Sequence, residues 1–249
     1  MTALGPIAAP TARPMRGSAQ PRPSNQPLVM ELAGLAGTGK STFARALARL
    51  DSGIRARPHV SLPRYLASVP PLIPTLLGLH WPFRGILDKE MKRIVRVRAL
   101  HQLARRATGC RTLLFDEGPV YMLARILVYG GERLQTRGFA RWWRRAITSW
   151  AATLDLIVWL DAPNHVLAER LRTRSQWHPV QDASPEAIVR FLDSYRAAYA
   201  RVVSELTAAR PLAVWTVVTD HRSPALDASE LLARLRGPQG IALRPWTLP

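Results

Sequence analysis

The segment from Gly34 to Ser41 reads GLAGTGKS and fits the phosphate-binding pattern G-x-x-x-x-G-K-[ST] at every defined position. A short apolar run over residues 28–32 precedes it, and apolar residues at helical spacing follow over residues 42–50. In such a loop the glycines let backbone N–H groups converge on phosphates, Lys40 reaches the β- and γ-phosphates, and the Ser41 hydroxyl binds Mg²⁺. The pattern therefore predicts a site for Mg²⁺ and a nucleotide, which we take as ATP with GTP left open, and nucleotide contacts at Gly34, Ala36, Gly37, Thr38, Gly39, Lys40, Ser41 and Thr42.

Two carboxylates, Asp116 and Glu117, directly follow the apolar run over residues 112–115. From the end of a strand, an aspartate can hold the magnesium shell or orient an acceptor hydroxyl. Its other role would be to cap the next helix. Because ligands bind at strand ends in open α/β sheets, we expect Asp116 to act with Ser41 at the metal. Glu117 stays open between a pocket residue and a helix start.

Three arginines, Arg170, Arg172 and Arg174, alternate shortly after another apolar run and lead into a polar segment over residues 175–184. A solvated helix end would explain them, because Arg170 and Arg174 share a helix face. We interpret the region instead as a lid whose arginines neutralise charge on a transferring phosphoryl group. His178 beside Trp177 is either a substrate contact or a surface residue. The expected catalytic set is Lys40, Asp116, Arg170 and Arg174.

Alternating strands and helices must position these residues. Hydrophobic patterning predicts strands over residues 28–32, 57–61, 112–115, 156–160 and 213–218. It predicts helices over residues 42–50, 84–107, 120–128, 139–152, 164–173, 185–208 and 225–235. Such alternation indicates an α/β fold, a parallel sheet with helices on both faces and ligands at the carboxyl ends of the strands.

The chain has 249 residues, which fits one large domain. We expect that domain over residues 28–236, a proline-rich floppy leader over residues 1–27 and a loosely held tail over residues 237–249. An uncharged stretch over residues 65–83 has the length of a membrane span, but four prolines interrupt it. We expect no transmembrane segment there and a segment that packs over a pocket, with shallow membrane contact left open.

The formal net charge is +18, and arginine supplies 32 of the 35 basic residues. One interpretation is a surface that binds nucleic acid or other anions. The other, which we favour, is that scattered arginines solvate the surface, because no single block concentrates the charge. Cys110 is the only cysteine, which excludes an intrachain disulfide and a cysteine-based zinc site and fits a reducing, cytoplasmic compartment.

The pattern resembles the thymidylate kinase and deoxynucleoside kinase group of the P-loop kinase superfamily over about residues 28–235. Arg170, Arg172 and Arg174 are similar to the Arg-x-Arg-x-Arg lid of that group, and residues 219–224 to its turn near the adenine. The resemblance implies a three-layer P-loop fold. In the group an arginine usually follows the strand-end carboxylate, where this chain has Glu117. That difference argues against a nucleoside monophosphate acceptor and leaves a neutral, hydroxyl-bearing or cationic acceptor open.

The leading hypothesis is an ATP- and Mg²⁺-dependent small-molecule kinase, whose chemistry is mainly positioning and charge neutralisation. Its acceptor pocket is expected between the second strand and the long helix, near His59, Ser61, Arg64 and Arg93. The alternatives are a P-loop ATPase acting in nucleic-acid binding or regulation and a nucleotide-binding regulator without catalysis. No nucleic-acid module is recognisable, so the expected partner is a small-molecule acceptor and not nucleic acid. A homodimer stays open.

Overall fold

The computed structural model describes residues 26–80, 89–175, 177–219 and 223–236. The expected leader at residues 1–27 lies outside the described residues except for its last two positions, and the expected tail at residues 237–249 lies outside them entirely. The expected domain over residues 28–236 contains all the helices and strands that the structure describes.

The centre of the fold is a parallel five-stranded sheet with the order β2-β3-β1-β4-β5. The central strand β1 pairs over residues 28–31 with residues 112–115 and over residues 30–34 with residues 156–160. The strands are β1 (Leu28–Gly34), β2 (Ile54–Ala56), β3 (Thr112–Phe115), β4 (Leu156–Asp161) and β5 (Ala213–Val218).

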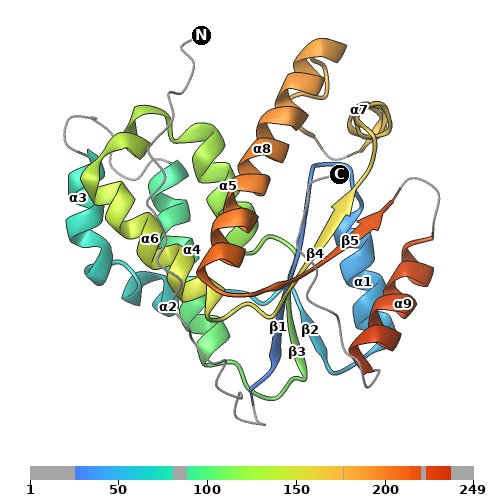
Figure 1. The fold of residues 1–249 in the computed structure, drawn as a ribbon, viewed down its shortest axis with the longest axis horizontal. Coiled ribbons are helices and arrows are strands. Elements are labelled where there is room, and N and C mark those ends of the chain that lie inside the picture. Colours follow the sequence, from blue (N-terminus) through green and yellow to red (C-terminus); the bar gives the residue numbers. More distant parts are fainter. Residues whose placement is uncertain (1–25, 81–88, 176, 220–222, 237–249) are drawn as a thin grey trace.

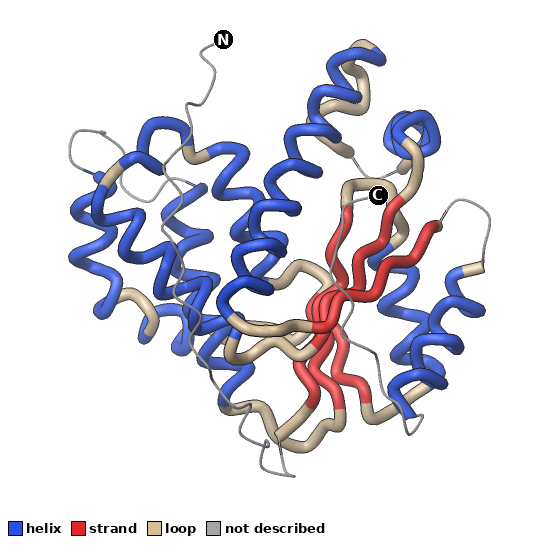
Figure 2. Tube along the Cα trace, viewed as in Figure 1, coloured by secondary structure: helices blue, strands red, loops and turns tan. Residues whose placement is uncertain are grey.

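Helices cover both faces of this sheet, so the domain has three layers (Figures 1 and 2). One face packs against α1 (Lys40–Leu50) and α9 (Pro224–Arg236), through residues such as Phe43 and Leu231. The other face packs against a larger group of helices, seen on the left of Figure 1. The remaining helices are α2 (Leu62–Ala67), α3 (Ile73–His80), α4 (Lys89–Arg105), α5 (Pro119–Tyr129), α6 (Arg137–Ala151), α7 (Asn164–Thr173) and α8 (Pro185–Ala209), with short 3-10 turns at Pro70–Leu72 and Gly131–Gln135.

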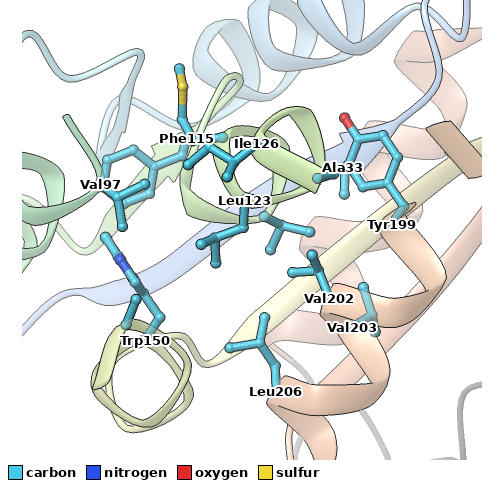
Figure 3. Packing of buried hydrophobic residues seen from close by; sticks show 14 of the residues in the cluster. Ala33, Val97, Phe115, Leu123, Ile126, Trp150, Tyr199, Val202, Val203 and Leu206 are labelled. Carbon is cyan, nitrogen blue, oxygen red and sulfur yellow. The ribbon is translucent and has the colours of Figure 1, made fainter. Parts of the chain in front are cut away.

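The larger core forms where α5, α6 and α8 meet the sheet (Figure 3). Phe115 of β3 stacks edge-on against Trp150 of α6, with 6.0 Å between the ring centres. Leu123 of α5 and Val202 and Leu206 of α8 are fully buried beside them. This packing fixes α5, which begins four residues after β3 and therefore sets the position of the loop between them.

One expectation about this region needs correction. The second strand is β2 over Ile54–Ala56 and not residues 57–61, because Arg57 turns out of extended backbone with φ 53° and is followed by Pro58, which has no N–H to donate. The proline-rich stretch forms helices over its described part. Its described prolines, Pro70, Pro71 and Pro74, lie in the first turn of a 3-10 helix or of α3, where the missing N–H costs nothing.

The other expected elements agree with the structure to within two residues, except that the helix expected from residue 84 is described only from Lys89. Residues 81–88 lie outside the described part of the chain. Among the described residues, no helix has both the length and the apolar character that a membrane crossing needs.

Candidate active site

The loop between β1 and α1 has the backbone shape of a phosphate cradle. Gly34, Gly37 and Gly39 all take positive φ angles, of 144°, 90° and 83°. A Cβ on Gly34 would lie 2.2 Å from the carbonyl oxygen of Leu160 on the neighbouring strand, so no side chain fits there. The fully buried Thr38 donates its hydroxyl to the Leu35 carbonyl at 2.9 Å and its backbone N–H to the same oxygen at 3.4 Å, so both donors stabilise the turn of the loop.

Lys40 is the first residue of α1, and its side chain folds over the loop. The Nζ atom donates to the carbonyl oxygens of Gly34 at 2.9 Å and Leu35 at 2.7 Å. Burial lowers the pKa of Lys40 to about 8, although the carboxylates of Asp116 and Glu117 act in the opposite direction. The ammonium group is thus held inside the cradle with these two carboxylates near it.

Ser41 and Asp116 come together at the carboxyl edge of the sheet. The Ser41 Oγ donates to the Asp116 Oδ2 at 2.9 Å, and Asp116 is only 7% exposed. A serine hydroxyl and a carboxylate oxygen are both hard oxygen ligands of the kind that Mg²⁺ prefers. The two residues that the sequence pairs at a metal are therefore direct neighbours.

Arg57, which sequence reasoning missed, completes this cluster. Its Nε and Nη2 both donate to the Asp116 Oδ2, at 2.9 and 2.6 Å. The expected strand over residues 57–61 placed Arg57 inside the sheet, whereas it lies just beyond the end of β2. An arginine directly before a proline was the available signal, since the residue before a proline often ends an element.

Glu31 is a second residue that the sequence did not bring forward. It is fully buried on β1 and accepts hydrogen bonds from the backbone N–H groups of Val120 at 2.8 Å and Tyr121 at 2.9 Å, in the first turn of α5. Burial raises the pKa of Glu31 to about 8, against the effect of these bonds. A Cβ on Gly118 would lie 2.6 Å from the Glu31 Cδ, so glycine is needed there. The sequence signal that could have identified Glu31 was a carboxylate within an otherwise apolar strand.

The lid arginines take different positions. Arg170 of α7 donates from Nη1 to the Gly37 carbonyl at 3.3 Å and from Nη2 to the Thr219 carbonyl at 2.7 Å, so it joins the phosphate loop to the end of β5. Arg174 follows the end of α7 and lines a cavity with Lys40. Arg172 is exposed and lines none of the cavities described below.

Among the described residues, three cavities open at the phosphate loop or the start of α1, and a fourth lies between α4 and α5. A cavity of about 490 Å³ lies beside Thr219 and Pro224, on the side where the adenine turn was expected; residues 220–222 of that turn lie outside the described residues. Cavities of about 630, 860 and 370 Å³ share Glu117 as a lining residue. The 630 Å³ cavity runs from the phosphate loop to aromatic residues of α5, α8 and the lid, namely Tyr121, Tyr129, Trp177, Phe191, Tyr195 and Tyr199.

The expected acceptor residues are divided among these cavities. His59 lines the 860 Å³ cavity with Arg57 and Asp116, and Arg93 lines the 370 Å³ cavity. Ser61 and Arg64 line none of the four.

Trp177 and His178, which are neighbours in the expected lid, both line the 630 Å³ cavity, but their side chains differ in exposure. His178 places its ring edge-on to Phe191, with 5.3 Å between the ring centres, and burial lowers its pKa. The Trp177 side chain is 74% exposed.

Comparisons with known proteins place the fold. No protein-family model and no curated protein matches the sequence. Among solved structures, deoxyadenosine kinase from M. mycoides with bound dATP is 11% identical to this chain and superposes with a TM-score of 0.51. The superposition covers 84% of this chain and 100% of the kinase chain. Thymidylate kinase from Candida albicans is 14% identical, matches 86% of this chain and 92% of its own, and gives a TM-score of 0.50. The expected fold class and resemblance are thereby confirmed at the level of the fold: the chain has the three-layer α/β fold of the P-loop kinases, in the form seen in deoxynucleoside and thymidylate kinases.

Proposed function

We propose that the protein is an ATP- and Mg²⁺-dependent phosphotransferase that phosphorylates a small-molecule acceptor. The observation that carries this proposal is the 2.9 Å bond between Ser41 and Asp116 beside Lys40, at the head of a cavity that continues away from the phosphate loop. A phosphate cradle alone would fit many nucleotide-binding proteins. A cavity of about 630 Å³ that opens from the cradle is of the size that holds a small second substrate.

The donor set fits the metal. Ser41 and Asp116 offer a hydroxyl and a carboxylate oxygen, which would hold Mg²⁺ together with oxygens of the nucleotide. When bound, Mg²⁺ neutralises charge that develops on the β- and γ-phosphates.

The chain's own residues account for the remaining steps of binding and positioning. Lys40 exchanges its two carbonyl partners for phosphate oxygens, and the loop N–H groups bind the same phosphates. Arg174 lines the cavity from the lid side and neutralises the transferring group, while Arg170 holds the loop against the end of β5.

Glu117 is the carboxylate that we place nearest the acceptor. It is exposed, lines the three cavities on the acceptor side and makes no hydrogen bond within the described part of the chain. Its role is to accept the hydrogen bond of the acceptor hydroxyl and orient it towards the γ-phosphate. We place the enzyme in the cytoplasm, which fits its single cysteine.

The test is a search for product. Purified protein is incubated with ATP and Mg²⁺ and panels of nucleosides, nucleotides, sugars, amino alcohols and hydroxy acids, and products are identified by mass spectrometry. We expect a phosphorylated product in one class, absent with Lys40→Ala. ATP hydrolysis that polynucleotide stimulates, with transfer to none of the small molecules, would contradict the proposal and favour a nucleic-acid-dependent ATPase.

A further inference from the structure

One face of α5 lines the acceptor cavity along its length. Tyr121, Arg125 and Tyr129 recur at intervals of four, which brings their side chains to one side of the helix, and all three line the 630 Å³ cavity together with Glu117, which precedes the helix. At 1.5 Å per residue, Arg125 lies about 9 Å along the axis from the first residue of the helix. Arg125 is thus well separated from the phosphate end, where Ser41 and Asp116 lie.

Arg125 is a half-buried cation that has no carboxylate partner among the described residues. Its Nη1 donates to the Tyr121 hydroxyl at 3.0 Å, and its guanidinium carbon lies 5.1 Å from the centre of the Tyr129 ring. Its Nε is buried and makes no hydrogen bond within the described residues, and no described carboxylate pairs with it. By contrast, Arg57 and Arg196 each pair with a buried aspartate. A partly desolvated charge of this kind is stabilised when an anion binds to it.

The charges around Arg125 make its end of the cavity positive. Arg125 also lines the 370 Å³ cavity, where its charged neighbours are Lys92, Arg93 and Arg96 of α4 and Glu117. From the lid, Arg174 and His178 face the same space, and both Arg174 and Arg125 contribute to the lowered pKa of His178. The acidic lining residues of the 630 Å³ cavity are Asp116 and Glu117, which lie at its phosphate end.

Aromatic rings form the walls between these two ends. Phe191 and Tyr195 of α8 lie 4.8 Å apart between ring centres, and Tyr195 contacts Tyr129 at 6.1 Å. Rings arranged in this way suit a planar or apolar body. The cavity therefore has carboxylates at one end, apolar walls along its length and an unpaired guanidinium at the other end.

We propose that Arg125 binds an acidic group of the acceptor, so that the acceptor is a small alcohol with a planar or apolar body and a carboxylate or phosphate at the end remote from the hydroxyl that is phosphorylated. This inference rests on the proposed function for the identity of the reacting hydroxyl. The binding of the acidic group to Arg125 is independent of catalysis. The presence of Glu117 in the sequence left a neutral, hydroxyl-bearing or cationic acceptor open. The inference retains the hydroxyl-bearing acceptor and adds a negative charge remote from its hydroxyl.

Two matched pairs of probes test the inference and separate the two acidic groups. The carboxylate pair is 4-(hydroxymethyl)benzoate and 4-(hydroxymethyl)benzamide. The phosphate pair is 4-(hydroxymethyl)phenyl phosphate and 4-(hydroxymethyl)phenol. Dissociation constants are measured by titration calorimetry on the full chain with bound ADP and Mg²⁺, for the wild type, Arg125→Gln, Arg125→Lys and the control Arg144→Gln, which changes an exposed residue of α6.

In at least one pair, we expect the acidic member to bind wild type about ten-fold or more tightly than its neutral partner, as for a charge-assisted hydrogen bond. Arg125→Gln should abolish this preference, Arg125→Lys should retain part of it, and Arg144→Gln should leave it unchanged. Circular dichroism checks that each variant is folded. Equal binding within both pairs, no binding by any probe, or a preference that survives in folded Arg125→Gln would overturn the inference.

A transfer assay with the same four probes separates this inference from the proposed function. Arg125-dependent binding of an acidic probe, with no phosphorylated product from any compound tested, would count against the function and leave the acidic subsite standing. Equal phosphorylation of acidic and neutral members by the wild type and by Arg125→Gln would leave the function standing and overturn the subsite.

Discussion

Ser41 and Asp116, 75 residues apart in the sequence, are joined by a hydrogen bond of 2.9 Å. They meet because β1 and β3 are parallel neighbours in register, so that the loops leaving both strands lie at the same edge of the sheet. Arg57 reaches Asp116 from β2, the next strand outward, and neutralises part of its charge. One carboxylate therefore connects three loops of the candidate site.

Asp116→Asn should lower kcat by about two orders of magnitude or more, the scale of a positioned electrostatic group. Asparagine keeps the volume and one acceptor oxygen, but it removes the charge that would bind Mg²⁺. Nucleotide affinity measured without metal should change little, because the phosphate loop supplies those contacts. Steady-state kinetics and metal-free titration check the two halves of this prediction.

The matched control for Asp116 is Asp161→Asn. Asp161 is also a buried strand-end aspartate paired with an arginine, through Arg196 Nη2 at 3.2 Å, but it lines none of the four cavities. Its variant should keep kcat. Near-normal turnover in Asp116→Asn would instead remove Asp116 from the site and leave Glu117 as the carboxylate on which transfer depends.

Lys40→Ala should abolish phosphoryl transfer and leave the fold in place. Because Lys40 Nζ bonds to two loop carbonyls, the free energy of unfolding should fall by about 1–3 kcal/mol, the effect of losing a charged donor. Urea unfolding with circular dichroism measures this change, and Lys92→Ala on the exposed side of α4 is the control. A variant that no longer unfolds cooperatively would show that Lys40 is needed for folding.

The features of this fold and site that could be predicted from the sequence are those formed by residues close together in the chain. The runs at residues 112–115 and 213–218 are apolar and bounded, so β3 and β5 were predicted with their observed bounds. The edge strand β2 has only three residues, and its pattern offered little signal. The phosphate loop was predictable because its chemistry is contiguous in the sequence.

The contacts that bring distant segments together were not predictable. Arg57 meets Asp116 only because β2 lies next to β3, and sequence does not give the strand order. Glu31 meets the first turn of α5 because β1 is central in the sheet and α5 packs over it. Long-range geometry of this kind depends on the packing of the whole core.

Arg170→Ala should weaken ATP binding by about ten-fold or more, because the phosphate loop and the end of β5 lose the charged donor that joins them. Arg172→Ala is the matched control, since Arg172 is exposed on the same helix, and its affinity should stay near that of the wild type. Titration with a non-hydrolysable ATP analogue measures both. Equal, small effects of the two substitutions would mean that Arg170 is an ordinary surface residue.

Trypsin should cleave after Arg174 more slowly when ATP, Mg²⁺ and acceptor are present than in the free protein. Arg174 follows the end of α7 in extended conformation, and Trp177 beyond it is 74% exposed, so the free segment has few apolar anchors. Ligands that draw Arg174 onto phosphate would protect this bond. Equal cleavage rates in all states would contradict the interpretation of this segment as a lid.

Glu31→Gln should change the dependence of stability on pH. Burial raises the pKa of Glu31 from 4.5 to about 8, so between these values the folded protein retains a proton that the unfolded chain has lost. Its contribution to stability is therefore present at low pH and is lost as pH rises, by up to about 1.4 kcal/mol per pH unit.

Glutamine is neutral at every pH and still accepts a hydrogen bond from the first turn of α5, so the variant should lack this decline. Urea unfolding at several pH values between about 5 and 8 gives the difference in unfolding free energy between wild type and variant, and that difference should shift in favour of the variant as pH rises. Glu169→Gln, at an exposed position on α7, is the control and should parallel the wild type. If the difference for Glu31→Gln stayed constant with pH, Glu31 would be ionised throughout the range, held in that state by the N–H groups of Val120 and Tyr121.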